Sequence, residues 1–391
     1  MAEEIPPTEN ATFDDIETFD DLDISENLLR GIYGYGYEVP SSIQKKAIRP
    51  ILSGRDIIAQ SQSGTGKTAS FLIGTMARVD LKNPNTQVIV ICPNRELANQ
   101  IYFNFKALNE YLGLTHSLVM GGTSVEKNFS ELDSGAQFVI GTPGRVFDMM
   151  RRYALKTTDL KCFIMDEADE MLSKGFKEQV YEIFQYMPKE IQVGLFSATM
   201  PDVTLDVTTR FMINPYRILV NTDMVTLEGI KQYYLGVEQE NWKIATLYDL
   251  YDRLRIKQTI IFVNSKRKAD FLKDQMEAED HVVSVIHATL TQDERDKTMK
   301  DFRMGNSRVL IATDIIARGI DVQQVEVVIN FDIPKYIETY IHRIGRSGRF
   351  GRKGLAINLV TEEEFEKLKK IQNYYSTEIV PLPENIKSLI G

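Results

Sequence analysis

The chain has 391 residues, of which 43% are hydrophobic and 26% are charged, as in ordinary soluble globular proteins of two or three domains. No apolar run approaches the length of a membrane span, and the N-terminus lacks the basic and apolar segments of a secretory signal. We therefore expect no membrane association and a cytosolic or nuclear protein.

The acidity of the chain is concentrated at its N-terminus. The formal net charge is −9, from 46 basic and 55 acidic residues, and residues 1–26 hold ten acidic residues but no Lys or Arg. The remainder thus has 46 basic and 45 acidic residues, a net charge of +1. An acidic total does not exclude RNA, because a nucleic-acid groove covers a small part of the surface. Residues 1–18 are predicted to be a disordered tail.

The two cysteines, Cys92 and Cys162, each lie in an apolar run. Their number permits a disulfide, but buried free thiols in a reducing compartment are the expectation. No Cys/His group has the spacing of a structural metal site.

Short β-branched runs alternate with helical patterns after the tail. In the first half, strands are predicted over residues 55–60, 87–93, 138–143, 162–169 and 192–199, with an amphipathic helix over 95–112. In the second half, they are predicted over residues 258–264, 281–288, 308–314, 325–331 and 354–360. Strands that are apolar on both faces and alternate with helices indicate a mainly parallel sheet covered by helices on both faces.

The alternation restarts near residue 230, which predicts two α/β domains. We place an N-terminal domain at 19–219, a short linker at 220–229 and a C-terminal domain at 230–391. The two halves share no residue-level repeat, so any kinship between them is architectural. One large doubly wound domain is the alternative, and it is unusual at this length.

The segment SQSGTGKT (61–68) follows the first predicted strand and leads into a helical pattern. It matches the phosphate-binding pattern GxxxxGK[ST], except that Ser61 replaces the first glycine. Glycines let backbone N–H groups surround phosphates, Lys67 would neutralise their oxygens, and the hydroxyl of Thr68 suits Mg²⁺. An ordinary glycine-rich turn is the alternative, but the preceding strand favours a nucleotide site.

The strand in CFIMDEAD (162–169) ends in the acidic pair Asp166 and Glu167. Carboxylates at the end of a buried strand are costly unless they meet a cation or a donor. In a P-loop protein the first can hold Mg²⁺ through water, and the second can orient or activate the attacking water. Alone, the tetrapeptide DEAD could simply cap a helix; together with the P-loop it predicts a catalytic edge.

These two segments resemble motifs I and II of the DEAD-box RNA helicases, and further motifs of that family occur in the right order. Residues 36–44 resemble the Q motif, with its isolated upstream aromatic at Phe19. The segments that resemble motifs Ia, GG, Ib, III, IV, QxxR, V and VI are, in that order, 93–98, 121–122, 142–145, 197–199, 261–264, 292–295, 312–321 and 342–349. The sequence departs from the family at Asn94, where threonine is usual, and at Ala288, where glycine is common.

The resemblance implies two tandem RecA-like P-loop domains and an RNA-dependent ATPase and helicase that uses ATP and Mg²⁺. The amide of Gln44 has one donor and one acceptor and suits the N6/N7 edge of adenine, whereas a plain polar helix residue is the alternative. Tyr37 would stack on the ring. The other nucleotide-binding residues implied are Phe19, Ser63, Gly64, Thr65, Gly66, Lys67, Thr68 and Asp321. The catalytic residues implied are Lys67, Asp166, Glu167, Arg346 and Arg349, with Thr68 and Asp166 toward Mg²⁺.

Arg346 and Arg349 could form an ordinary solvated face, but the resemblance makes them arginine fingers. Ser197 and Thr199 would couple the nucleotide to the RNA. The RNA-binding residues implied are Arg95, Gly122, Thr142, Arg145, Asn264, Gln292, Arg295, Thr313 and Arg318. Such donors and exposed backbone suit phosphates and 2′-hydroxyls, so little sequence preference is expected. The basic triplet 266–268 is read as a helix start facing solvent or RNA, with a localisation signal as the alternative.

Within the family, the strings TLEGIKQYY and YYSTEIVPLPENIKSLI resemble members that act in translation initiation and in the exon junction complex. This implies a monomeric core that unwinds mRNA 5′ leaders, binds single-stranded or duplex RNA and a scaffold protein, and is cytoplasmic. An ATP-gated RNA clamp of the exon junction complex, which would be nuclear, and a helicase of rRNA processing stay open. A P-loop ATPase acting on protein or DNA is disfavoured by the strings of motifs V and VI.

Overall fold

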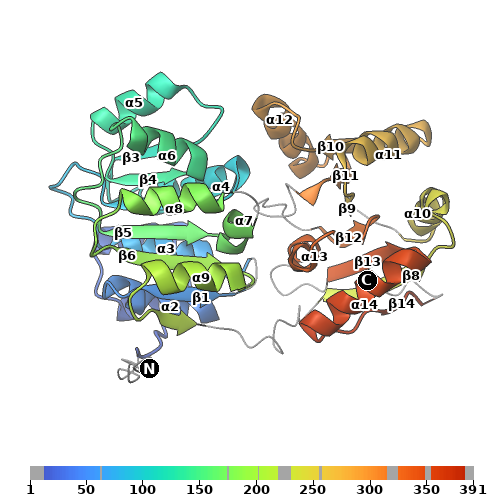
Figure 1. The fold of residues 1–391 in the computed structure, drawn as a ribbon, viewed down its shortest axis with the longest axis horizontal. Helices are drawn as coiled ribbons and strands as arrows, with labels where there is room; N and C mark the ends of the chain where they lie inside the picture. Colours follow the sequence, from blue (N-terminus) through green and yellow to red (C-terminus); the bar gives the residue numbers. More distant parts are fainter. Residues whose placement is uncertain are drawn as a thin grey trace, which may run out of the picture. The chain divides into compact units, whose positions relative to one another are not determined.

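The computed structural model describes residues 13–61, 64–173, 176–200, 202–218, 230–254, 258–314, 325–347 and 354–383. The chain divides into two compact units, residues 1–220 and 221–391. Each unit contains its own β-sheet, with helices around it (Figure 1). The linker predicted at 220–229 lies outside the described residues, and so does most of the tail predicted at 1–18.

The sheet of the N-terminal unit has seven strands in the order β3-β4-β2-β5-β6-β1-β7 within the described ranges. Its strands, all paired in parallel, are β1 (Ile57–Gln60), β2 (Val88–Ile91), β3 (His116–Val119), β4 (Phe138–Gly141), β5 (Cys162–Asp166), β6 (Gln192–Ser197) and β7 (Tyr216–Ile218). Its helices are η1 (Phe19–Asp21), α1 (Glu26–Gly34), α2 (Ser42–Leu52), α3 (Lys67–Met76), α4 (Arg95–Leu108), α5 (Val125–Asp133), α6 (Pro143–Arg151), α7 (Ala168–Ser173), α8 (Lys177–Gln185) and α9 (Asp202–Phe211).

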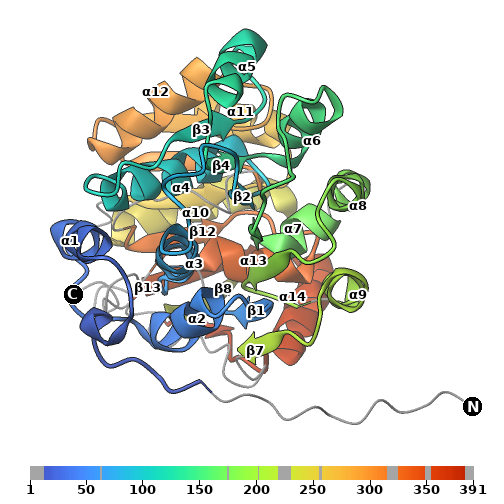
Figure 2. The ribbon, with the colours of Figure 1, turned by 90° about the vertical axis from the view of Figure 1, so that its left-hand side faces the viewer.

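Helices cover both faces of this sheet. Figure 2 shows α1, α3 and α4 on one side and α6, α7, α8 and α9 on the other. Adjacent residues of a strand enter different cores: Val88 packs in the cluster that contains Ile101 of α4, whereas Ile89 packs with Val180 of α8. This explains why the strands read as continuous apolar runs.

The sheet of the C-terminal unit has the order β10-β11-β9-β12-β13-β8-β14 over the described residues, again all parallel. Its strands are β8 (Ile230–Gly236), β9 (Thr259–Phe262), β10 (Val283–Ile286), β11 (Val309–Ala312), β12 (Val327–Asn330), β13 (Gly354–Val360) and β14 (Val380–Pro381). Its helices are η3 (Glu240–Trp242), α10 (Lys243–Arg253), α11 (Lys266–Ala278), α12 (Gln292–Arg303), α13 (Ile337–Ile344) and α14 (Glu362–Tyr375).

The two sheets share one topology, since adding seven to each strand number of the first order yields the second. The second sheet is also buried on both faces: Ile261 packs with Leu272 of α11, and Phe262 packs with Met299 of α12. The predicted α/β class, with two mainly parallel sheets covered on both faces, is confirmed, and a single doubly wound sheet is excluded.

The helix predicted over 95–112 ends earlier, at Leu108. Asn109 exchanges side-chain hydrogen bonds with Leu114, and Gly113 takes a positive φ of 73° that ends the turn.

Cys92 and Cys162 are free and buried, as predicted, and burial raises the pKa of Cys162 to about 12. None of the helices that the structure describes is long and apolar enough to cross a membrane.

Candidate nucleotide and RNA sites

Most candidate residues of the N-terminal unit lie at the carboxyl ends of strands, where ligands bind to parallel sheets. The phosphate-binding and catalytic candidates lie after β1 and at the end of β5, the coupling candidates lie at the end of β6, and the RNA candidates follow β2, β3 and β4. The Q-motif candidates Phe19, Tyr37 and Gln44 precede β1. The sheet order β3-β4-β2-β5-β6-β1-β7 groups the ends of the first set together and those of the second set together. Folding therefore sorts motifs that alternate along the chain into two neighbouring regions.

The P-loop candidate joins β1 to α3. Gly64 and Gly66 take positive φ values of 84° and 104°, which glycine adopts at little cost. Lys67 is the first residue of α3, and its ammonium donates to the carbonyl of Ser61 at 2.7 Å. The turn thus brings a buried lysine and a helix N-terminus into the same region, as phosphate binding requires.

Gln44 touches this turn. Its side-chain Oε1 accepts from the N–H of Ser41 at 2.8 Å, which completes a capping box at the start of α2. Its Nε2 donates to the carbonyl of Gly66 at 3.4 Å, and a Cβ added to Gly66 would come within 2.6 Å of that nitrogen. Gln44 therefore packs against the P-loop backbone, and reading of adenine by Gln44 stays a prediction.

The two aromatic candidates differ in exposure. Tyr37 is half-buried and lies beside Tyr35, with ring centroids 4.8 Å apart. Phe19 is fully buried, with its ring edge toward Tyr33. Phe19 thus lies in the core that supports α1, and a nucleotide contact by it stays a prediction.

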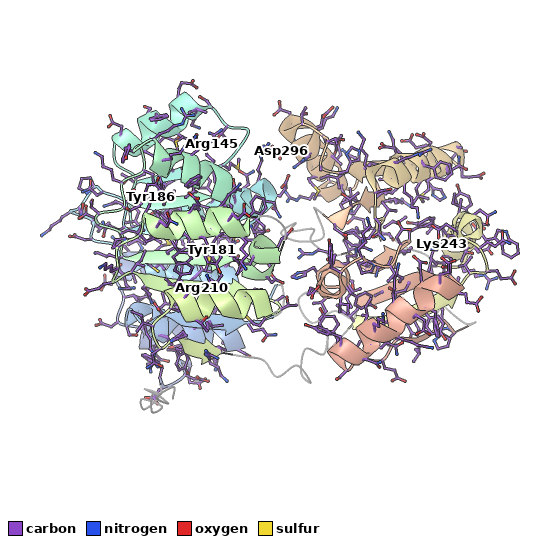
Figure 3. The ribbon with its side chains drawn as sticks, in the orientation of Figure 1. Arg145, Tyr181, Tyr186, Arg210, Lys243 and Asp296 are labelled. Carbon is purple, nitrogen blue, oxygen red and sulfur yellow. The ribbon has the colours of Figure 1, made fainter. Side chains whose placement is uncertain are left out.

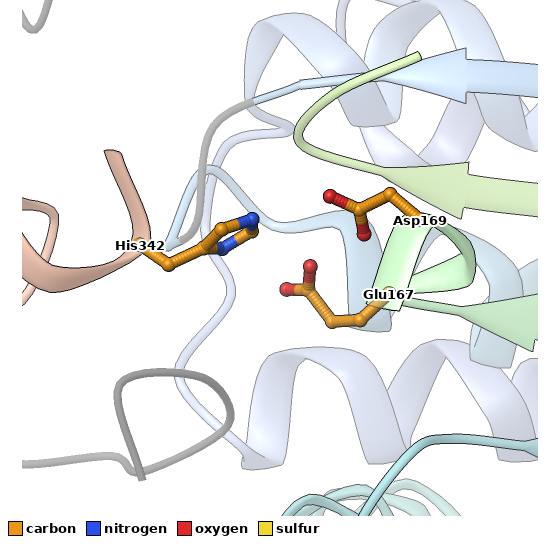
Figure 4. A group of neighbouring side chains, drawn as sticks. All are labelled: Glu167, Asp169 and His342. Carbon is orange, nitrogen blue, oxygen red and sulfur yellow. The ribbon is translucent and has the colours of Figure 1, made fainter. Parts of the chain in front are cut away.

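The acidic pair lies where β5 ends and α7 begins: Asp166 is the last residue of β5, and Glu167 follows it. Figure 4 shows the side chain of Glu167 beside that of Asp169. Asp166 and Glu167 are both buried, and the Glu167 carboxylate lies 3.9 Å from the Lys67 ammonium. Burial and the neighbouring Glu167 raise the pKa of Asp166, while Lys67 opposes this shift. Glu167 also has a positive φ of 52°, a strained conformation for glutamate that is concentrated at functional sites.

This cluster fits a divalent cation. Two buried carboxylates lie near one lysine, so the region carries an excess of negative charge that is held away from water. Burial first, and the charge of Glu167 second, raise the pKa of Asp166. A hard cation with oxygen ligands would relieve that charge. Thr68, half-buried in the first turn of α3, carries a hydroxyl of the kind that such a cation accepts as a ligand.

Motif III is attached to the DEAD segment through Asp169. The Thr199 hydroxyl donates to the Asp169 carboxylate, and the Asp169 N–H donates to the Ser197 hydroxyl at 3.4 Å. All three residues are buried. The coupling candidates thus contact the acidic turn directly, so a shift of either segment would move the other.

The RNA candidates of the N-terminal unit are partly engaged inside the protein. Gly122 has a positive φ of 86°, which favours glycine, and a Cβ there would lie 2.4 Å from Nη1 at the end of the Arg95 side chain. The Arg145 guanidinium (Figure 3) donates to the Thr123 carbonyl at 3.2 Å and to Asn128 Oδ1 at 2.8 Å. Arg145 therefore holds the GG loop against α5.

Two further residues of these segments begin helices. Thr142 is the residue before α6 and lies at the end of β4. The Asn94 side chain accepts from the N–H of Leu97 at 2.9 Å and caps α4. Asparagine at this position thus keeps the cap that a hydroxyl side chain could also form.

The same sorting recurs in the C-terminal unit. Asn264 follows β9, Thr313 follows β11, and Arg295 lies on α12 after β10; the order β10-β11-β9 places these strand ends side by side. The Arg295 guanidinium donates to the Ala288 carbonyl at 2.6 Å. Gln292 is the first residue of α12. Arg346 is buried, and its Nε donates to the His342 carbonyl at 3.2 Å.

Four predicted site residues lie outside the described ranges. They are Ser63, Arg318, Asp321 and Arg349. Their roles stay predictions.

The motifs did not predict the residues that organise the C-terminal unit. Lys243 is the first residue of α10, which follows β8, just as Lys67 is the first residue of α3, which follows β1. Lys243 is fully buried (Figure 3) and pairs with Glu364 at 2.6 Å and with Glu240 at 2.9 Å. Only the shared sheet order reveals this correspondence, since no glycine-rich turn precedes Lys243.

The region above Lys243 is unsuited to phosphate. It is a cavity of about 630 Å³ whose lining holds more acidic than basic side chains. The six carboxylates are those of Glu238, Glu240, Asp332, Glu362, Glu363 and Glu364, and the three ammonium groups are those of Lys268, Lys335 and Lys367. Glu240, Asp332 and Glu364 lie close enough together to share a cation, but the ammonium groups of Lys243 and Lys268 already bridge them. The basic triplet 266–268 does start a helix, yet Lys268 is directed to Asp332 and Glu240.

Comparison with known proteins agrees with this geometry. Two family models match, DEAD/DEAH box helicase over residues 41–207 and helicase conserved C-terminal domain over residues 242–351. Eukaryotic initiation factor 4A of Caenorhabditis elegans is 54% identical over 375 residues, which cover 96% of this chain and 93% of that protein. The ATP-dependent RNA helicase eIF4A of Scheffersomyces stipitis is 55% identical over 373 residues, with 95% and 94% covered.

A solved structure extends the likeness to the fold. S. cerevisiae Dbp5 bound to RNA and ADP BeF3 is 37% identical, has a TM-score of 0.89, and is matched over 95% of this chain and 97% of that chain. Sequence and fold agree with these relatives over nearly the whole length. The chain belongs to the DEAD-box family of ATP-dependent RNA helicases.

Proposed function

We propose that this helicase hydrolyses ATP at the end of β1 and β5 and uses the hydrolysis cycle to bind, locally unwind and release RNA. The observation that carries the proposal is the buried group of Lys67, Asp166 and Glu167 beside a P-loop turn. A Mg²⁺ ion bound through Asp166 and Thr68 would neutralise charge on the phosphates.

The chain's own residues divide the chemical work. Lys67, at the N-terminus of α3, would hold the β- and γ-phosphate oxygens, where the helix end also favours negative charge. Glu167 would orient the attacking water and accept its proton. Gln44 would bind the adenine edge and, through Gly66, sense how the P-loop closes on the phosphates.

RNA would bind along the ends of β2, β3 and β4 and of β9, β10 and β11. The candidates there supply guanidinium, amide and hydroxyl donors, which suit the sugar-phosphate backbone of a single strand. Binding would therefore show little sequence preference. The nucleotide and RNA candidates are divided between the two units, so each ligand would favour closure of the units and raise the other's affinity equally.

We place the protein in translation initiation, where it would unwind mRNA 5′ leaders in the cytoplasm as a monomeric core bound to a scaffold protein. The high identity to relatives named initiation factor 4A supports this role. The second candidate is an ATP-gated RNA clamp in the nucleus, favoured by sequence strings shared with the exon-junction members of the family. RNA release after ATP addition separates the two: rapid release supports the initiation role, and retention for many turnovers supports the clamp.

The test of the activity itself is ATP hydrolysis with and without single-stranded RNA, using the full chain. We expect stimulation by RNA of any sequence and loss of hydrolysis without Mg²⁺. Equal hydrolysis with and without RNA would contradict the proposal and revive an ATPase that acts on another partner.

A further inference from the structure

Arg343 lies where three strands of the C-terminal sheet end. It is the seventh residue of α13 (Ile337–Ile344) and is fully buried. Its guanidinium lies over the Phe262 ring, with Cζ 5.3 Å from the centroid. Phe262 ends β9, which pairs with β11 on one side and β12 on the other. One side chain thus lies beside the ends of three neighbouring strands, β11, β9 and β12.

Each edge of the guanidinium is bound to a different segment. Toward β11, Nε donates to Asp314 Oδ1 at 2.7 Å, and Nη2 lies 2.6 Å from the same oxygen in an ion pair. Toward β12, Nη1 donates to the Asp332 carbonyl at 2.6 Å and to Asn330 Oδ1 at 3.2 Å. Toward β9, Nη2 donates to Asn264 Oδ1 at 2.8 Å.

The cost of burying this cation is offset locally. Burial lowers the pKa of Arg343, and the Asp314 carboxylate opposes that shift. A planar guanidinium can serve several acceptors at fixed angles, which an ammonium cannot do. A fully buried arginine with so many partners is kept for geometry, since a surface arginine would avoid the cost of desolvation.

The residues fixed by Arg343 adjoin the functional candidates. Asn264 is itself an RNA candidate, and its N–H donates to the Asp332 carboxylate at 2.7 Å while its amide donates to the Ile333 carbonyl at 2.8 Å. Asp314 is the neighbour of the RNA candidate Thr313. On the other side, the Arg346 N–H donates to the Arg343 carbonyl at 3.1 Å.

We propose that Arg343 is a positioning residue that joins the RNA candidates after β9 and β11 to the turn after α13 that carries Arg346, so that RNA binding is transmitted to the arginine that serves hydrolysis. This inference rests on the proposed function. In this role Arg343 touches neither ligand. It acts by holding Asn264, Asp314 and α13 in fixed positions relative to one another.

The first test is Arg343→Lys in the full chain. Lysine keeps the charge beside Asp314 but cannot reach Asn264 and Asp332 together. Because Lys67 and Gln44 lie in the other unit, affinity for a fluorescent ATP analogue should stay within about twofold. RNA-stimulated kcat should fall at least tenfold, and the gain in RNA affinity caused by a non-hydrolysable ATP analogue should fall by a similar factor.

A milder variant covers the case in which Arg343→Lys does not fold. Asn330→Ala removes one acceptor of Nη1, together with the bond that Asn330 donates to Asn358, and leaves the Asp314 and Asn264 contacts in place. It should lower the same coupling factor by about two- to fivefold at a temperature well below its unfolding midpoint. Lys273→Met, which removes a cation from the exposed face of α11, is the matched control and should behave as the unmutated chain.

The outcomes separate the inference from the proposed function. If the unmutated chain shows no RNA stimulation, the proposed function is wrong. If it is stimulated by RNA, and folded Arg343→Lys or Asn330→Ala keeps the full coupling, the positioning role is wrong. A loss of thermal stability with unchanged coupling would likewise show that Arg343 only supports the fold.

Discussion

The Lys67 ammonium lies 3.9 Å from the Glu167 carboxylate, with both side chains almost fully buried. These residues come from different strand ends, β1 and β5, which are separated in the sheet by β6 alone. Before a nucleotide enters, each charge is thus partly compensated by the other. A phosphate would take over Lys67 and leave Glu167 available to water.

Glu167→Gln should nearly abolish ATP hydrolysis while nucleotide-dependent RNA binding persists. The amide keeps the shape of the side chain but loses the negative charge that activates water. Hydrolysis rate and RNA affinity with an ATP analogue should be measured on the same preparation. A rate near that of the unmutated chain would refute Glu167 as the catalytic carboxylate.

Gln44→Ala should weaken ATP binding and reduce selectivity over GTP. Loss of one bidentate base contact should cost about 1–3 kcal/mol of discrimination. The same change removes the Gln44 contacts with Ser41 and Gly66, so binding of both nucleotides should also weaken somewhat. Competition with ATP and GTP measures the selectivity; equal use of both by the unmutated chain would disprove adenine reading.

Arg349→Ala should leave ATP affinity largely intact yet remove most RNA-stimulated hydrolysis. Arginine fingers contribute roughly 10³–10⁵ in rate in other phosphoryl-transfer systems. The loss should include the mutual gain in affinity between ATP and RNA, which linkage makes equal in both directions. Titrating RNA with and without a non-hydrolysable analogue tests this, and an unchanged gain would contradict the arginine-finger assignment.

Lys243→Met should destabilise the C-terminal unit by about 3 kcal/mol, because it leaves the Glu364 carboxylate largely buried without the Lys243 ammonium as its partner. Glu240 is half exposed and should be solvated by water in the variant, so the loss of stability should lie at the lower end of the range for broken buried ion pairs. Lys369→Met is the control: its exposed pair with Glu366 should cost no more than about 1 kcal/mol. Denaturant unfolding measures both, and equal effects would contradict the account.

The buried carboxyl of Asp56 should make stability depend on pH. Its oxygens accept from the N–H groups of Val193 at 2.7 Å and Ile213 at 2.6 Å, but burial outweighs these bonds and raises its pKa. The folded protein therefore binds this proton more tightly than the unfolded chain, and the contribution of the protonated group is lost as pH rises through the raised pKa.

The comparison with Asp56→Asn isolates this effect. The variant loses one acceptor and does not titrate at this position, so the unmutated chain should be more stable by an amount that is greatest at acid pH and shrinks toward neutral pH. Thermal unfolding of both proteins across that range provides the check. A stability difference that grows with pH would reverse the predicted sign.

Much of this molecule could be predicted from local sequence. Apolar runs such as QVIVICP alternate with amphipathic segments, and this period alone indicates parallel sheets buried on both faces. The P-loop turn is equally local, because Gly64, Gly66 and Lys67 must be consecutive to surround a phosphate. The phosphate-binding candidates can therefore be predicted from the sequence without the fold.

The tertiary structure decided which distant residues share a site. Asn264 and Arg343 are 79 residues apart, and Lys243 and Glu364 are 121 apart, and no periodicity relates either pair. Their contacts depend on the strand order β11-β9-β12-β13-β8, which is set by crossovers and packing over the whole unit. A buried cation needs a carboxylate partner, but burial does not determine which carboxylate that is. The partners of Lys243 and Arg343 can therefore be identified only from the folded sheet, which brings the carboxylates to them.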